Sequence, residues 1–404
     1  MADGALTTRP SASRLPVALR IALVYFAARL VTTGFLAGAA ALSGPGSRFG
    51  EGATVGTLLM GWDAQWYWLI ALNGYPAELP RDDAGVVAEN GWAFMPVYPF
   101  LARALGALAG QYPVGAVLLS LVAGYLACLV LHALLRARLD EPATMWAVVF
   151  FASGPLAALF QVGYAESLFL LLLFLSLWCV QRRRFGWLYL LIPAMGYTRP
   201  GVLAFALFLG LYGIVRWLRR RDDPLPARQI VHIVAAGALA VVVGFSWQVI
   251  AGAVTGEPTA YLETELAWRR AWLGADHTFV PFSGFLDAVP VWFGVWGLPV
   301  ALGYVLLAAL VAAAGALLLR QRHVRMLGME VRLWSASYLI YLLAVFFPQS
   351  SIFRLLIPLS PLYGALAAPR AMWWRVGVLV AGLAGQWWWI QSMYALGNTY
   401  YRIP

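Results

Sequence analysis

One acidic residue stands among aromatic side chains early in the chain, within Gly61–Tyr75 (GWDAQWYWLIALNGY). Asp63 lies between Trp62 and Trp66, with Tyr67 close behind. Rings that partly remove a carboxylate from water raise its proton affinity, which suits a general base. The rings also suit sugar faces, although aromatic belts at membrane interfaces are the commoner cause of such residues. Because the helix dipole favours an acid at a helix start, the position alone leaves catalysis and simple helix stabilisation open.

A second acid and two arginines occupy other turns between apolar runs. Glu166, in the stretch GYAES, borders the almost wholly apolar run 168–177, where a carboxylate is costly and by default marks function. A helix-capping acid at an interface is the alternative. Arg199 in YTRPG and Arg354 in SSIFR are suited to bind an anion such as a phosphate bidentately. Arg199 is also suited to pair with Glu166, and these two roles are compatible.

The segment 253–290 adds further charged residues and one histidine, and we expect it to form a loop with its own short helix. Its notable residues are Glu257, Glu263, Glu265, Trp268, Arg269, Arg270, Asp276 and His277. His277 is a candidate for acceptor binding, with an ordinary surface position as the alternative. Asp276 and His277 are too few for a metal site, which needs three or more ligands. We therefore predict no metal and no other cofactor; a divalent cation is compatible with the sequence but has no support in it.

The elements that hold these residues follow from composition. Hydrophobic residues make up 62% of the 404, and charged residues only 11%, which indicates an integral membrane protein. Apolar runs of spanning length recur at 16–42, 112–135, 143–162, 164–181, 186–217, 229–252, 291–319, 332–347, 354–368 and 374–394. Pro193 and Pro200 divide the run 186–217 into two passes. The sequence thus predicts an all-α polytopic protein with about eleven transmembrane helices.

The charges predict the topology. All 28 basic residues are arginines, and they flank alternate ends of the spans, which places these turns in the cytoplasm. They include Arg9, Arg14, Arg136, Arg138, Arg182–Arg184, Arg216, Arg219–Arg221, Arg228, Arg320, Arg322, Arg325, Arg332, Arg370 and Arg375. Six of the 18 acids fall on the same side: Asp3, Asp140, Glu141, Asp222, Asp223 and Glu330. The other twelve lie at or near the outer face, where function is expected. The basic inner face indicates membrane anchoring and no nucleic acid.

We expect one membrane domain over 1–404. Residues 1–15 form a cytoplasmic N-terminus, followed by a first span that stays as an anchor. Two outer segments are long, 43–111 and 253–290. In the first, Trp62–Tyr75 has apolar residues at helical spacing, and 94–109 predicts another short helix. Two interfacial helices joined by a polar loop would form a platform on the outer surface.

Five motifs resemble the PIG-V mannosyltransferases, within the GT-C class of membrane glycosyltransferases. GWDAQWYWLIALNGY is similar to the family pattern W-D-x-x-W-Y-x-x-I-A-x-x-G-Y, and WAFMPVYPFLARAL to A-F-F-P-x-Y-P. GYAESLFLLLLF is similar to Y-x-E-S-L-F, while YTRPGVL and SSIFRLLIPLSPLYGAL match in order. Met95 departs from the usual aromatic residue of the second pattern, which we expect to change packing only.

The resemblance implies a GT-C-like fold and transfer of mannose from a polyprenyl-phosphate donor to an acceptor on the outer face of the cell membrane. Asp63 matches the acid that serves GT-C enzymes as base. From their chemistry, Arg199 and Arg354 would then stabilise the leaving phosphate, and Glu166 would orient an arginine or bind a sugar hydroxyl. The expected sugar- or acceptor-binding residues are Trp62, Trp66, Tyr67, Tyr164, Glu166 and His277.

Inversion at the sugar carbon is expected, because a single displacement is the simplest route. The expected partners are the lipid-linked donor, a glycolipid, lipoglycan or protein acceptor, and the bilayer, with the enzyme acting as a monomer. Two alternatives stay open: a GT-C transferase using another lipid-linked sugar such as arabinose, and a transporter or flippase of lipid-linked sugars. Transporters tend to place polar groups near the midplane and to show repeats, whereas here the unusual polar residues are expected at outer turns.

Overall fold

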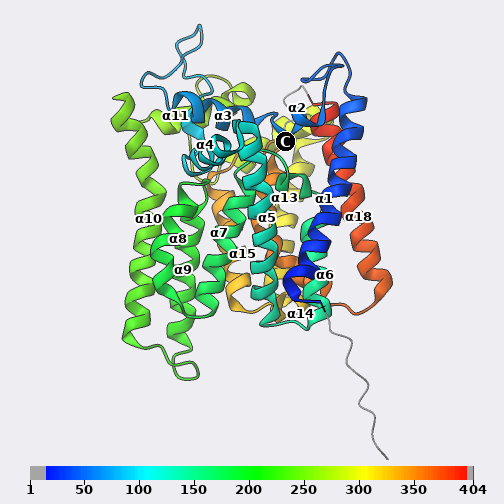
Figure 1. Ribbon diagram of the computed structural model, residues 1–404. Coiled ribbons are helices and arrows are strands. Elements are labelled where there is room, and N and C mark those ends of the chain that lie inside the picture. Colours follow the sequence, from blue (N-terminus) through cyan, green and yellow to red (C-terminus); the bar gives the residue numbers. More distant parts are fainter. Residues whose placement is uncertain (1–14, 398–403) are drawn as a thin grey trace, which may run out of the picture.

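The computed structural model describes residues 15–397 and residue 404. In this part of the chain the regular structure is helical (Figure 1), apart from one isolated antiparallel bridge between Arg81 and Val87. The α-helices in chain order are α1 (Val17–Leu42), α2 (Val55–Leu59), α3 (Asp63–Asn73), α4 (Val97–Ala109), α5 (Tyr112–Arg136), α6 (Glu141–Ser153), α7 (Glu166–Gln181), α8 (Leu188–Gly196), α9 (Val202–Leu218), α10 (Ala227–Thr255), α11 (Ala260–Leu273), α12 (Gly284–Val295), α13 (Val300–Arg320), α14 (Arg322–Met326), α15 (Met329–Val345), α16 (Ile352–Leu355), α17 (Tyr363–Ala367) and α18 (Met372–Ile390).

Four of these helices, α1, α5, α10 and α13, are long and apolar enough to cross a membrane, by length and composition. A rise of 1.5 Å per residue lets each reach across a hydrocarbon core of about 30 Å. Shorter apolar helices pack among them: α7 and α4 against α5, and α9 against α10 and α15. The chain is therefore an all-helical protein suited to a membrane. The total of eleven spans stays a prediction.

Three predicted runs are interrupted in the structure. In the run 143–162, α6 ends at Ser153, and after Gly154 and Pro155 the chain forms a 3₁₀ helix over Ala157–Phe160. The run 291–319 belongs to two helices, α12 and α13, because Gly297 adopts φ +66° and Pro299 follows it. The run 354–368 forms α16, a 3₁₀ helix and α17 in place of one continuous helix. Pro358 contributes to this break because proline has no N–H to donate within a helix. Because the run 354–368 is broken, Arg354 lies in the short helix α16 and not within a long helix.

The arginine-rich turns gather at one end of the bundle, the lower end in Figure 1. Ion pairs tie the helix ends together there: Arg20 and Arg136 with Glu141, Arg138 with Glu330, Arg183 and Arg216 with Asp223, and Arg370 with Asp140. The charge pattern thus correctly predicted that these turns share one end. Asp3, Arg9 and Arg14 lie outside the described residues.

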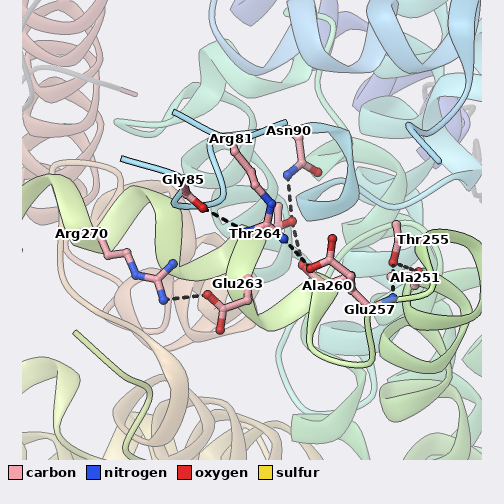
Figure 2. Close-up of polar contacts among 10 residues, drawn as sticks. All are labelled: Arg81, Gly85, Asn90, Ala251, Thr255, Glu257, Ala260, Glu263, Thr264 and Arg270. Carbon is pink, nitrogen blue, oxygen red and sulfur yellow. Dashed lines mark hydrogen bonds and ion pairs between the residues drawn. The ribbon is translucent and has the colours of Figure 1, made fainter. Parts of the chain in front are cut away.

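The opposite end carries α2, α3, α4 and α11, the upper end in Figure 1. The polar loop after α3 is attached to α11 and to the turn that precedes it by two contacts shown in Figure 2. Arg81 pairs with Glu257 at 2.6 Å, and the amide of Asn90 donates to the Thr264 hydroxyl at 2.9 Å. The predicted helix in Trp62–Tyr75 is confirmed as α3, and the predicted helix in the 253–290 segment as α11. Helices α2, α3, α4 and α11 thus lie together at this end of the bundle, and the loop after α3 is linked to α11 and the turn before it by a hydrogen bond and an ion pair.

Candidate active site

Four charged residues from distant parts of the chain form one ion-pair network at this end. Arg354 donates from Nη1 to the carboxylate of Asp63 at 2.5 Å, and its Nε lies 3.3 Å from Glu166 Oε1. The same Oε1 lies 3.5 Å from Nη2 of Arg199. Carboxylate and guanidinium groups therefore alternate along the network, in the order Asp63, Arg354, Glu166 and Arg199. The structure brings together the predicted base, both predicted phosphate-binding arginines and the predicted orienting acid.

Asp63 is positioned by an unusual backbone at the start of α3. The preceding Trp62 has φ +53°, a conformation uncommon for residues other than glycine. Its ring is held by Arg48, whose guanidinium lies 4.6 Å from the ring centroid, and by Phe49 at 6.1 Å. The indole N–H donates to the Met393 carbonyl at 3.1 Å. These contacts hold Trp62 in place and thereby position the first residue of α3, Asp63, so that its carboxylate faces Arg354.

Glu166 reaches the network because its turn lies against α2 and α3. A Cβ on Gly163 would lie 3.0 Å from the Met60 sulfur and 3.3 Å from the Ala64 Cβ. The Gly163 N–H donates to the Leu59 carbonyl at 2.8 Å. Glycine thus permits the close approach that brings the first residue of α7, Glu166, beside Asp63. The Glu166 side chain is almost fully buried, at 2% exposure.

The two arginines of the network, Arg199 and Arg354, lie where long helices are interrupted. Arg199 follows α8, and the chain then passes through Pro200 and Gly201, which has φ +136°. Arg354 lies in α16, where the Tyr338 hydroxyl donates to the neighbouring Leu355 carbonyl at 2.8 Å. Both guanidinium groups are therefore positioned by short segments between longer helices.

The network is electrically balanced and partly open. Its two carboxylates and two guanidiniums sum to no net charge, which lowers the cost of burying them together. Burial raises the pKa of Asp63 above the ordinary value, although the positive charge of Arg354 opposes this shift. The Asp63 side chain keeps 20% of its surface exposed, ten times the fraction of Glu166. Asp63 is thus the carboxylate of the network that a ligand can reach most readily.

The predicted sugar-contacting residues are placed unequally around this network. Tyr164 is buried beneath it, with the Arg354 guanidinium 5.4 Å from its ring centroid, and Tyr67 is buried against Phe94 and Tyr98. Trp62 is 7% exposed, whereas Trp66 is half-buried and has more of its ring available. His277 lies in the turn after α11, and the ion-pair network does not include it. Contact of these residues with sugar stays a prediction.

An apolar groove of about 730 Å³ is lined in part by the segment that carries Arg354, although none of the four network residues lines it. Its lining begins at Phe353 and Leu356, on either side of Arg354 in sequence, and extends to Gln321 at the end of α13. Other lining residues come from α17 and α18, among them Tyr363, Leu366, Trp388 and Trp389. Phe353, Leu356, Leu366 and Trp388 remain exposed on the bundle surface, so the groove is open to the surrounding medium.

Sequence reasoning missed two features of this site. Tyr394 is fully buried and donates its hydroxyl to that of Tyr164 at 3.4 Å, but it lies in a π-helix, Gln391–Ala395, at the end of an apolar run with no pattern of its own. The groove depends on how four separate segments pack, which no local pattern states. Within the described residues, no group of three or more His, Cys, Asp or Glu side chains is arranged to hold a metal ion.

Comparison with known proteins adds no relative. No model of a known protein family matches the chain, and a search of curated proteins finds no match. The likeness to PIG-V mannosyltransferases therefore rests on the five motifs quoted above.

Proposed function

We propose that this protein is an inverting GT-C-type glycosyltransferase that moves mannose from a polyprenyl-phosphate-linked donor to an acceptor hydroxyl. The arginine-rich end would face the cytoplasm, which would place the Asp63 network on the outer face of the cell membrane. The acceptor class that we favour is a glycolipid or lipoglycan.

The observation that carries the proposal is that one short segment belongs to two unlike sites. Phe353 and Leu356 line the apolar groove of about 730 Å³, which is open to the bundle surface, and Arg354 between them belongs to the ion-pair network. A lipid phosphate needs both halves of this arrangement, an apolar groove for its chain and a guanidinium for its head. Asp63 is in direct contact with the same guanidinium. A lipid-phosphate sugar bound this way has its reacting carbon near a partly exposed carboxylate.

The proposed reaction is a single displacement. Asp63 accepts the proton of the acceptor hydroxyl, whose oxygen bonds to the anomeric carbon as the bond from that carbon to the phosphate oxygen breaks. The electron pair of that bond leaves with the lipid phosphate. Total charge in the site is unchanged, because one negative charge moves from Asp63 to the phosphate beside Arg354 and Arg199. The two arginines therefore stabilise the charge that develops in the transition state.

The decisive experiment offers the purified protein a polyprenyl-phosphate mannose donor and a panel of glycolipid, lipoglycan and peptide acceptors, with products identified by mass. We expect a mannosylated product from at least one acceptor and none from the Asp63→Asn variant. A Leu366→Trp variant, which fills the exposed wall of the groove, should raise the donor KM while a matched Leu72→Trp variant outside the groove should not. Absence of transfer to every acceptor, or equal transfer by Asp63→Asn, would reject the proposal.

A further inference from the structure

A second cavity, of about 300 Å³, lies on the exposed side of α3 and is separate from the apolar groove. Trp66 and Asn73 line it from α3, and Tyr75, Glu89 and Asn90 line it from the loop that follows. It combines aromatic surface with a carboxylate and two amides. In the part of the chain that the structure describes, its lining includes no arginine or histidine.

Two residues in the wall of this cavity, Tyr75 and Asn90, are held in place by contacts with their neighbours. Tyr75 stacks on Trp92 with ring centroids 4.7 Å apart, and its hydroxyl donates to the Phe94 carbonyl at 2.8 Å. Asn90 accepts from the Trp92 N–H at 3.0 Å and donates to Thr264 of α11, as Figure 2 shows. A cavity with fixed walls loses little conformational freedom when a ligand binds. This is the expected property of a binding site and is unusual for a surface loop.

The chemistry of the lining selects among ligands. A carboxylate without a neighbouring arginine in the lining disfavours phosphates and other anions, because like charges repel. Amide and carboxylate groups instead form hydrogen bonds with hydroxyl groups, and the Trp66 and Tyr75 rings offer apolar faces of the size of a sugar ring. An aliphatic chain would leave the Glu89 carboxylate without a polar partner. The match is to a neutral carbohydrate.

We propose that this cavity binds a sugar unit of the acceptor, with Glu89 and Asn73 bonding its hydroxyl groups and Trp66 packing against its ring. The inference rests on the proposed transferase function and adds the residues that would hold the sugar of the acceptor. Asp63 and Trp66 are three residues apart in α3 and so are neighbours on its surface. A sugar on Trp66 would extend toward the carboxylate that accepts the hydroxyl proton. Partial burial and the charge of Asp63 also raise the pKa of Glu89, although the positive charge of Arg48, which is not part of the lining, opposes this shift.

The test measures binding apart from transfer. Asp63→Asn protein in lipid nanodiscs, without donor, is titrated with methyl α-mannoside, methyl α-glucoside and a methyl α-mannobioside, and binding is followed by saturation-transfer NMR. We expect saturable binding of at least one glycoside. Added Glu89→Gln or Asn73→Ala should raise its Kd about tenfold, the effect of losing one hydrogen bond to a charged or strongly polar group. Glu78→Gln, an exposed acid of the same loop outside the cavity, is the matched control.

The outcomes separate the two proposals. Absence of saturable binding by all three glycosides, or binding that Glu89→Gln and Asn73→Ala leave unchanged, overturns the sugar-binding cavity even if the protein transfers mannose. Glycoside binding that depends on Glu89, in a protein that transfers no mannose from the lipid donor, retains the cavity and rejects the proposed transferase. In the active protein the same two substitutions should raise the acceptor KM with little change in the donor KM.

Discussion

Replacing Asp63 by Asn tests the proposed base with the least disturbance to the fold. The carboxylate accepts from Arg354 at 2.5 Å and is 20% exposed, and Asn keeps its size and one acceptor oxygen. The amide cannot take the acceptor proton. General-base catalysis contributes roughly 10²- to 10⁴-fold in rate, or about 3 to 5 kcal/mol of barrier. We therefore expect kcat to fall by at least about 100-fold.

The stability of the same variant follows from the partners that remain. Removing one member of a buried ion pair costs about 3–5 kcal/mol where it leaves an unpaired charge. Arg354 still has Glu166 at 3.3 Å, although Glu166 is then shared by two arginines. The expected cost is the loss of one hydrogen bond to a charged group, about 1.5–3 kcal/mol, and the 20% exposure of this position lets water replace part of the lost charge. The protein should therefore still fold.

The assay measures mannose transfer from a radiolabelled lipid donor by detergent-purified protein, alongside thermal unfolding of the same sample. Asp83→Asn, an exposed acid in the same outer segment, is the control and should keep full activity. A purified Asp63→Asn protein with more than a tenth of the normal kcat would refute the base assignment. Loss of folded protein would instead refute the argument that Glu166 is a sufficient partner for Arg354 in this variant.

Three further predictions concern the same network and the topology. Arg199→Ala and Arg354→Lys should each raise the donor KM about tenfold or more, as measured with a fixed acceptor; an unchanged donor KM in both would remove the phosphate-binding role. The rate should fall as pH drops through a value above the ordinary range of Asp, because burial raises the pKa of Asp63 and its protonated form cannot act as a base; a pH–rate profile flat down to pH 4 would contradict this. In intact cells an impermeant maleimide should label Asp276→Cys and not Arg221→Cys, and the reverse pattern would overturn the orientation.

The sequence predicted individual helices better than their arrangement. The long runs became α1, α5 and α10 to within three residues at each end, because apolar length alone determines such helices. Proline and glycine within the run 291–319 broke it into two helices, which average hydropathy does not register. Helix α3 was predictable because the spacing of its apolar residues is a local pattern. The φ of Trp62 was not, since it depends on contacts with Arg48 and Met393.

The sequence indicated which residues belong to the site, but not all of the contacts between them. Arg199 with Glu166 was an expected pair, because both stand at turns on the same side of neighbouring helices. The contact of Asp63 with Arg354 joins residues 291 positions apart, and its partner choice depends on the packing of α3, α7 and α16. Residue type and turn position indicate which charges need partners. They do not indicate which of several partners lies within reach.

The alternating order of charges bears on how the site would work. Four charges buried in a chain with only 11% charged residues are tolerable because each has a partner without any ligand. A phosphate that approaches Arg354 must compete with Asp63 for the same guanidinium. In the proposed reaction, donor binding would therefore release Asp63 from its strongest positive neighbour, and a carboxylate freed in this way is a stronger base. The ion pair between Asp63 and Arg354 would thus restrict proton transfer to the state in which a donor phosphate has taken the place of Asp63 on Arg354.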